Sequence, residues 1–258
     1  MKNSRTNFIS AVLYFLYTVL LTIVTFSFSL IFILAFWWFL ILPRYKRFNL
    51  FDHLVAQPWT FVFNKLLLLM RMKLIGLKFV DRKRTTVYIC NHQSWVDISV
   101  VTRYTHSVTL SKKQATYIPF IGALVSLAGP VFVDRDDTSS RLKTVKEIIG
   151  LLRKGYSLTL FPEGTRTIDG KLAEPNNAMV KLCYKLNVPV VAGAVEGTID
   201  VLPRNRFYVK CFRKVVLEFN APLYPKDFGS EDEFANACWK KVVNTHDEIV
   251  KKYFTEKT

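Results

Sequence analysis

The stretch of residues 91–97, Asn-His-Gln-Ser-Trp-Val-Asp, contains a candidate base and a carboxylate. It lies between residues 86–90, whose short apolar run predicts a buried strand, and an apolar pattern from Ile98 onward that predicts a helix. His92 and Asp97 would not share a face of one continuous helix, so they can meet only if the chain bends between them. A histidine held by a carboxylate is oriented to accept a proton from a hydroxyl group, which is the general-base half of acyl transfer.

The same residues also allow a purely structural interpretation. Ser94 and Asp97 have the Ser-x-x-Asp spacing that can cap the first turn of a helix. His92 would then be an ordinary polar residue in the turn before that helix. This stretch alone leaves both interpretations open.

A second polar stretch, Phe-Pro-Glu-Gly-Thr-Arg at residues 161–166, directly follows another predicted strand. In open α/β sheets, ligand sites gather at the carboxyl ends of the strands. Gly164 would let the backbone turn close to a ligand, and the planar guanidinium of Arg166 can grip a phosphate with two hydrogen bonds. A turn with an exposed Glu163–Arg166 pair is the plainer alternative.

Basic residues follow two further predicted strands. Lys112 and Lys113 come after residues 108–111, and Arg135 closes the run Gly-Pro-Val-Phe-Val-Asp-Arg at 129–135. Read structurally, the lysines are solvated and Asp134 pairs with Arg135. Residues 188–191, Val-Pro-Val-Val, begin an apolar strand, and such a strand is more often core than binding site.

From Asp81 to the C-terminus, short apolar runs alternate with helical patterns. This alternation predicts an α/β fold with a mixed, mostly parallel sheet flanked by helices. A helix over 139–154 would end at Gly155, and a helix over 230–253 would open with acidic residues and close with lysines, which matches the helix dipole. The other predicted helices cover 94–104 and 177–186, the predicted strands cover 86–90, 108–111, 130–133, 157–161 and 189–195, and further β structure is predicted over 207–219.

Residues 8–42 contain no charged side chain. This run exceeds the ~20 residues that cross a bilayer core and is too long for the apolar part of a cleaved signal peptide, so it predicts a membrane-embedded segment. Basic residues flank it on both sides, and cytoplasmic flanks attract positive charge. A re-entrant helical hairpin and a single tilted span are both compatible with this pattern. We predict an N-terminal membrane anchor at 1–48 and a second domain at 49–258, on the cytoplasmic face of the membrane.

The beginning of the second domain, residues 49–79, is amphipathic. Lys65, Arg71, Lys73 and Lys78 alternate with apolar residues, as expected of a segment that lies on an anionic membrane surface. A helix with a basic face that packs on its own domain is the alternative.

The overall composition indicates an anionic partner. The 258 residues carry a formal charge of +16, and the apolar surplus is concentrated at the N-terminus, which favours an anionic membrane. The sequence lacks a recognisable nucleic-acid motif, so nucleic acid is not an expected partner. The four cysteines are dispersed, which predicts reduced core residues, and the four histidines have no metal-site spacing. We therefore expect neither a metal nor a cofactor.

Taken together, the four blocks at 92–97, 129–135, 161–166 and 188–191 resemble, in order and rough spacing, the four motifs of the glycerolipid acyltransferase family. This family contains the lysophosphatidic acid and glycerol-phosphate acyltransferases. The resemblance runs from Thr86 to Thr198. His-x4-Asp followed by Phe-Pro-Glu-Gly-Thr-Arg is a highly specific combination, whereas either motif alone is not.

The resemblance implies a role for each matching residue. In the family, the histidine deprotonates the acceptor hydroxyl for attack on an acyl thioester, and the aspartate orients it; here these are His92 and Asp97. The fourth motif is linked to the acyl donor or to packing beside it, and family members open with a membrane-docking helical element. The residues that the resemblance implies in acceptor binding are Lys113, Arg135, Glu163, Gly164, Thr165 and Arg166.

These implications add up to a membrane-bound acyltransferase domain that transfers an acyl group from acyl-CoA or an acyl carrier protein to a lysophospholipid. Lysophosphatidic acid is the first choice of acceptor. Another lysolipid is the alternative acceptor, because the sequence departs from the family's pattern in two places. Residues 174–177 lack the lysine of the usual Phe-Lys-x-Gly run, and residues 192–197 replace the more apolar stretch that usually continues the fourth motif. A non-catalytic basic module that binds anionic membranes is the alternative from another class. A serine hydrolase would need a Gly-x-Ser-x-Gly elbow, which the sequence lacks.

Overall fold

The computed structural model describes residues 2–112, 131–133, 138–206 and 208–255, and its centre is a seven-stranded sheet with the order β1-β7-β6-β2-β5-β3-β4. Neighbouring strands are parallel except β6 and β7, which are antiparallel. The predicted mixed, mostly parallel sheet is therefore confirmed. The strands are β1 Arg71–Ile75, β2 Val87–Ile89, β3 Val108–Lys112, β4 Val131–Val133, β5 Leu158–Leu160, β6 Val190–Glu196 and β7 Lys214–Phe219.

Helices connect and cover these strands. The α-helices are α1 Lys2–Phe36, α2 Arg44–Phe51, α3 Gln57–Phe61, α4 Val96–Thr105, α6 Thr138–Arg153, α7 Ala178–Lys185, α8 Thr198–Val201 and α9 Glu231–Ile249. Shorter 3-10 or π-helical turns are η1 Trp37–Ile41, η2 Asp52–Ala56, η3 Val62–Leu67, η4 Leu77–Phe79, η6 Pro225–Asp227 and η7 Val250–Phe254.

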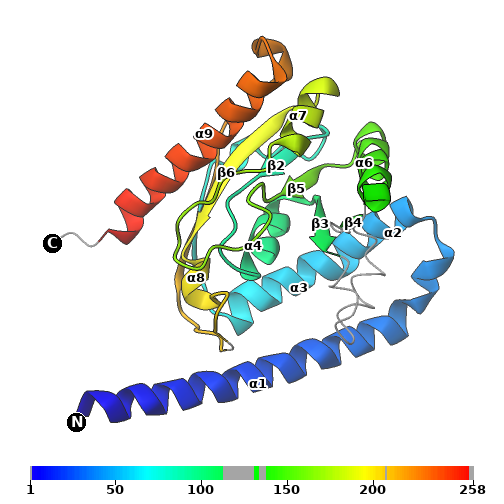
Figure 1. Cartoon of the computed structure of the whole chain (residues 1–258). Coiled ribbons are helices and arrows are strands. Elements are labelled where there is room, and N and C mark those ends of the chain that lie inside the picture. Colours follow the sequence, from blue (N-terminus) through cyan, green and yellow to red (C-terminus); the bar gives the residue numbers. More distant parts are fainter. Residues whose placement is uncertain (1, 113–130, 134–137, 207, 256–258) are drawn as a thin grey trace.

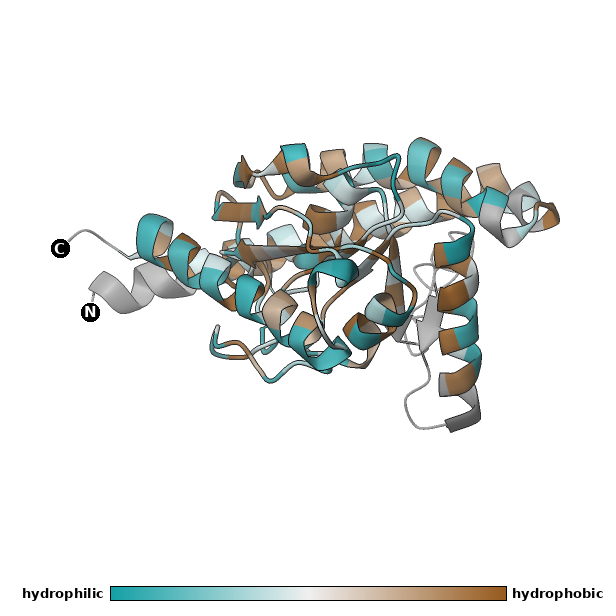
Figure 2. Cartoon of the chain, turned by 90° about the horizontal axis from the view of Figure 1, so that it is seen from above, coloured by the Kyte–Doolittle hydropathy of each residue, from teal (hydrophilic) through white to brown (hydrophobic). Residues whose placement is uncertain are grey.

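The sheet has an apolar core on each face, because successive strand residues point to opposite sides. Val87 and Ile89 of β2 pack toward α6, α7 and α9, whereas Tyr88 and Cys90 pack toward α4 and one residue of α1, Leu21. The covering helices α6 and α9 alternate hydrophilic and hydrophobic residues along their length (Figure 2), as expected of helices with one face on a core. The sheet thus lies between two helical layers (Figure 1).

The N-terminal apolar segment forms one continuous helix, α1, so a hairpin within residues 8–42 is wrong and the single-helix interpretation holds. Ser29 does not interrupt this helix, because its hydroxyl donates to Thr25 O at 2.8 Å within the helix. Ile9–Phe36 is long and apolar enough to cross a membrane, and little of it is buried. The chain reverses only after η1 and returns along α2 and α3 (Figure 1).

The helix α1 is attached to the rest of the chain along part of its length. Thr18 Oγ1 accepts a hydrogen bond from Val209 N at 2.8 Å, and the ring of Phe28 stacks on Trp59 with centroids 4.1 Å apart. Its exposed apolar side chains include Ile9, Leu13, Leu16, Leu20, Ile23, Ile31 and Leu34. This arrangement leaves a long apolar surface uncovered beside the α/β domain.

The segment 49–79 divides into a helical part and a strand that the sequence analysis missed. The helical part packs on α4 through polar contacts: Asn64 Nδ2 donates to Ser99 O at 3.2 Å, and Ser99 Oγ donates to Asn64 Oδ1 at 2.7 Å. Its other side exposes Leu54, Phe61 and Leu66. Among the described strands, this strand, β1, pairs with β7 alone, and its edge position explains why its basic residues resembled a surface helix.

Candidate active site

Three adjacent strands end together at one edge of the sheet, and the polar motifs follow them. The order β6-β2-β5 is parallel throughout, so the carboxyl ends of these strands meet at the same edge. His92 follows β2, residues 161–166 follow β5, and Glu196 closes β6. The topology therefore brings together residues that are about a hundred positions apart in the sequence.

His92 and Asp97 are in direct contact. His92 Nδ1 lies 2.8 Å from Asp97 Oδ2, with the imidazole 15% exposed and the carboxylate fully buried. The chain bends between the two residues and α4 begins only at Val96, so the bend required by the sequence is confirmed. With the Nδ1 proton bonded to the carboxylate, the other ring nitrogen, Nε2, is left as the acceptor.

Asp97 is held by hydrogen bonds to both of its oxygens. Oδ2 also accepts from the backbone N–H groups of Gln93 at 2.6 Å and Ser94 at 2.8 Å, and Oδ1 accepts from the hydroxyl of Thr198. Asp97 thus ties down the turn before α4, as half of the expected capping interaction, while also holding His92. Because these two N–H groups bind Asp97, they are not free to stabilise an oxyanion.

The imidazole of His92 is supported from a second strand end. It stacks on the ring of Phe161 with centroids 4.3 Å apart, and the backbone N–H of His92 donates to Glu163 Oε1 at 2.7 Å. The other oxygen of Glu163 accepts from Ala173 N at 2.8 Å. Burial raises the pKa of the Glu163 carboxyl, against the opposing effect of these two bonds. Glu163 therefore joins its own motif to the His92 stretch by accepting from the backbone of His92, and to residue 173 by accepting from the backbone of Ala173.

Arg166 lies against Trp95, with its guanidinium carbon 4.9 Å from the ring centroid. A second guanidinium is close, because Arg204 Nη1 donates to Arg166 O at 3.0 Å. Burial and the charge of Arg204 lower the pKa of Arg166. Within residues 2–112, 131–133, 138–206 and 208–255, neither arginine forms a salt bridge with a carboxylate. Two uncompensated cations at this position favour binding of an anion.

The remaining predicted acceptor-binding residues divide into two groups. Gly164 has a φ of +66°, the left-handed conformation expected of a tight turn, and Thr165 beside it is exposed. Lys113 and Arg135 lie outside the described residues, so their place relative to His92 stays a prediction.

Neither Ser94 nor Cys90, the two nucleophilic side chains nearest to His92 in the sequence, is placed to form a covalent intermediate. Ser94 is fully buried, and its hydroxyl donates to Leu202 O at 2.7 Å. Cys90 is also fully buried, and burial raises the pKa of its thiol, which keeps it protonated. The arrangement is suited to a base that activates an incoming hydroxyl group.

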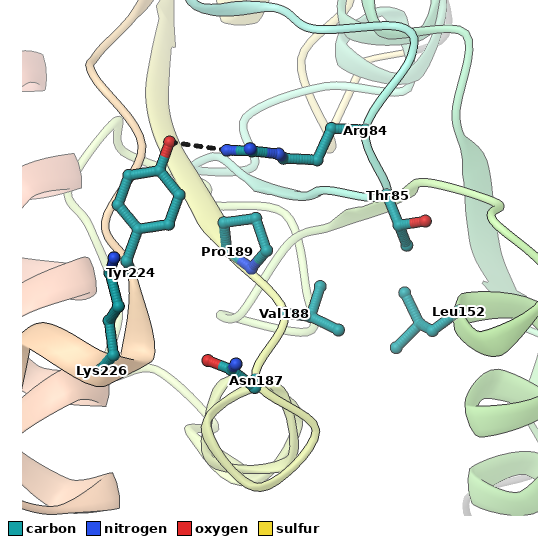
Figure 3. A pocket seen from close by; sticks show the side chains of 8 residues that line it. All are labelled: Arg84, Thr85, Leu152, Asn187, Val188, Pro189, Tyr224 and Lys226. Atoms are coloured by element: carbon teal, nitrogen blue, oxygen red, sulfur yellow. Dashed lines mark hydrogen bonds between the residues drawn. The ribbon is translucent and has the colours of Figure 1, made fainter.

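The fourth block, residues 188–191, lies at the opposite edge of the sheet. Val188 and Pro189 precede β6 and line a pocket of about 420 Å³ at the amino ends of the strands (Figure 3). Across this pocket, Arg84 Nη1 donates to Tyr224 OH at 2.9 Å. The next two valines are buried in the core. These positions support a packing role for this block.

A group of potential metal ligands lies away from His92, although the sequence spacing did not indicate one. Side-chain ligand atoms of Asp52, His53 and His106 lie within 4.8 Å of one another. Asp52 already accepts from His106 Nδ1 at 2.6 Å and from Gln57 Nε2 at 2.9 Å. Arg82 and Lys154 line the pocket beside this group, and their positive charges oppose a cation. We assign no metal to it.

Two residues at the site were not singled out from the sequence. Thr198, which donates to Asp97, directly follows β6, so the rule that sites gather at strand ends could have found it. Arg204 lies in a loop with no motif of its own, and only the fold brings it to Arg166.

The chain matches the family model described as Acyltransferase over residues 71–196, which include His92, Asp97 and Arg166. It is 30% identical over 187 residues to 1-acyl-sn-glycerol-3-phosphate acyltransferase BAT2, chloroplastic, of Brassica napus, covering 72% of this chain and 53% of that protein. It is 28% identical over 177 residues to the 1-acyl-sn-glycerol-3-phosphate acyltransferase of Escherichia coli (strain K12), covering 64% and 71%. The chain spans about half the length of the plant relatives that it matches.

A solved structure is similar over nearly the whole chain. The crystal structure of the 1-acyl-sn-glycerophosphate (LPA) acyltransferase PlsC from Thermotoga maritima aligns with a TM-score of 0.78 at 25% identity. The alignment covers 95% of this chain and 98% of that one. It therefore includes the N-terminal helical part as well as the sheet.

Proposed function

We propose that this protein transfers a fatty acyl group from acyl-CoA or an acyl carrier protein to the free hydroxyl of a lysophospholipid, with lysophosphatidic acid as the acceptor and phosphatidic acid as the product. The observation that carries this proposal is the His92–Asp97 contact at 2.8 Å, beside two arginines that lack carboxylate partners in the described part of the chain. The names of the relatives support the same acceptor.

In the proposed reaction, His92 Nε2 takes the proton of the acceptor hydroxyl as its oxygen attacks the thioester carbon. The carbon–sulfur bond then breaks, the ester forms, and the imidazolium returns its proton to the departing thiolate. Asp97 stabilises the imidazolium and fixes the ring through Nδ1. No cofactor is needed, because every proton is returned within this cycle.

The acceptor is recognised in this proposal by its phosphomonoester. Arg166 and Arg204 would bind the dianionic headgroup, with Lys113 and Arg135 contributing further cations as the family resemblance implies. Gly164 and Thr165 would form the turn that brings Arg166 to the headgroup, and Glu163 would hold that turn against His92.

We further propose that residues 1–48 anchor the protein in an anionic membrane and that residues 49–258 form the acyltransferase domain on its cytoplasmic face. The exposed apolar side of α1 and the apolar residues of the 49–67 run support a common membrane-contacting surface. A lysophospholipid resides in that membrane, so this attachment would bring the acceptor to the enzyme.

The first experiment measures thiol release from acyl-CoA by the purified protein in detergent micelles, with a panel of lysophospholipids. We expect release that depends on lysophosphatidic acid, with a phospholipid product of matching mass. If acyl-CoA gives no release, acylated carrier protein replaces it. A folded protein that is silent with both donors and every lysolipid would contradict the enzyme and favour a non-catalytic membrane-binding module.

Replacing Arg166 with alanine, or Arg204 with glutamine, is expected to raise the acceptor KM about tenfold or more for a phosphomonoester lysolipid, because one charge-assisted contact is lost. The KM for an uncharged monoacylglycerol should change little. Lys171→Gln is the matched control, since it removes one exposed charge from the same loop region. Equal effects of the arginine variants on charged and uncharged acceptors would argue against phosphate contact.

A further inference from the structure

A second buried carboxylate lies behind the His92–Asp97 pair. Glu196, at the end of β6, accepts a hydrogen bond from Gln93 Nε2 at 2.5 Å through Oε2. Gln93 directly follows His92, its side chain is fully buried, and its backbone N–H donates to Asp97. A carboxylate that accepts from an amide forms a stronger bond than a neutral acceptor, so Glu196 fixes Gln93 firmly.

The connection continues to α9. His246 Nε2 lies 2.8 Å from the same Glu196 oxygen, with side-chain exposures of 9% and 12%. On the other side, Thr198 Oγ1 lies 3.4 Å from Gln93 Oε1 and donates to Asp97 Oδ1. A continuous set of polar contacts therefore runs from His246 through Glu196, Gln93 and Thr198 to Asp97. Burying Glu196 near Asp97 is unfavourable unless a cation compensates its charge, and His246 can supply that cation.

We infer that Glu196 and His246 are positioning residues for the base His92, acting through Gln93 and Asp97. This inference rests on the proposed function for its meaning in catalysis. Glu196 lies in the stretch 192–197, which departs from the continuation that the family resemblance implies. Neither residue touches the reacting atoms; together they hold the backbone N–H of Gln93 where Asp97 needs it.

The protonation of His246 gives this inference a measurable consequence. Burial alone would lower the pKa of His246, but its contacts with Glu196 and Asp247 outweigh burial and raise the pKa above 6.5. Glu196 of β6 and Asp247 of α9 are the charged groups that face it, while Glu218 on β7 interacts instead with Glu248, Lys252 and Lys241. The stability from this pair is fully present below the pKa of the unfolded chain and is lost as pH rises through the raised pKa.

The test compares Glu196→Gln and His246→Gln with the wild type. Both variants keep a hydrogen-bonding group but remove the ion pair, so kcat should fall about five- to tenfold at pH 6.5, with the acceptor KM within about twofold. In the wild type, kcat should decline above the pKa of His246, and this decline should be absent in both variants. The kcat of the double variant should be little lower than that of either single variant, because the two single variants and the double variant all remove the same ion pair.

His106→Asn is the matched control. His106 also bonds to a buried carboxylate, Asp52 at 2.6 Å, but it lies at the far end of α4 and outside the connected set. Asparagine places an amide near the bonding Nδ1 and tolerates the positive φ of this position. This variant should keep the wild-type kcat and pH profile. A decline that persists in folded His246→Gln, with unchanged kcat, would overturn the inference.

An NMR measurement that does not depend on acyl transfer tests the positioning role separately from the proposed reaction. The imidazole signals of His92, followed by NMR through a pH titration, should shift in Glu196→Gln and His246→Gln but not in His106→Asn. If the wild type shows no transfer while these signals move, the reaction is wrong and the positioning role stands. If transfer is robust and neither the signals nor kcat responds, the positioning role is wrong and the reaction stands.

Discussion

His92→Ala is expected to lower kcat about 10²–10⁴-fold, because a positioned general base contributes an effect of this size. The acceptor KM should change little, since no headgroup contact is assigned to the imidazole. The measurement is lysolipid-dependent thiol release at saturating acceptor, with product identified by mass. The loss should be smaller at high pH, where the hydroxyl of the acceptor needs less assistance.

The structure supplies a control for this substitution. His106→Asn removes a histidine that is also bonded to a buried carboxylate, but at the opposite edge of the sheet, and asparagine tolerates the positive φ of this position. Both variants should unfold at temperatures near that of the wild type, whereas only His92→Ala should lose transfer. Turnover within threefold of the wild type in folded His92→Ala would remove the general base from the mechanism.

Most of the sheet could be predicted from the sequence because its strands are short apolar runs between helical patterns. The strands around residues 87–89, 108–112, 131–133, 158–160 and 190–196 all lie where these runs predicted them. The sequence did not predict the strand β1, because an edge strand can expose every second residue. The exposed Arg71 and Lys73 then resemble the basic face of a helix. The sequence left the form of α1 open between a hairpin and a single span, because the basic residues on both flanks are compatible with either form.

In the candidate site, too, contacts between residues close in the sequence could be predicted, whereas most contacts between distant residues could not. The His92–Asp97 contact was predictable because a bend over five residues satisfies it. Glu196 and Arg204 reach the site only through the fold, across separations that no local pattern records, whereas the position of Thr198 just after β6 follows the rule that sites gather at strand ends. The family resemblance implies acceptor binding by Glu163, and the two backbone N–H groups that its oxygens bind in the structure could not be predicted from the sequence.

Asp97→Asn is the second substitution with a large expected effect, and the surrounding hydrogen bonds determine how it acts. The position of Oδ2 faces three donors: His92 Nδ1 and the N–H groups of Gln93 and Ser94. The asparagine oxygen should therefore take that position, and its NH₂ group should face the Thr198 hydroxyl, which can accept as well as donate. The tautomer of His92 is then preserved, and the variant loses mainly the negative charge that stabilises the imidazolium.

We therefore expect Asp97→Asn to lower kcat by about 10²–10³-fold, less than the ~10⁴ lost in catalytic triads where the same change gives the wrong tautomer. Asp97→Ala leaves the N–H groups of Gln93 and Ser94 unsatisfied, so it should also lower the free energy of unfolding by about 1–3 kcal/mol for each group. Thiol release and chemical denaturation of both variants separate these effects. If Asp97→Asn kept kcat within tenfold, Asp97 would be a structural residue of the turn and its charge would have no part in the reaction.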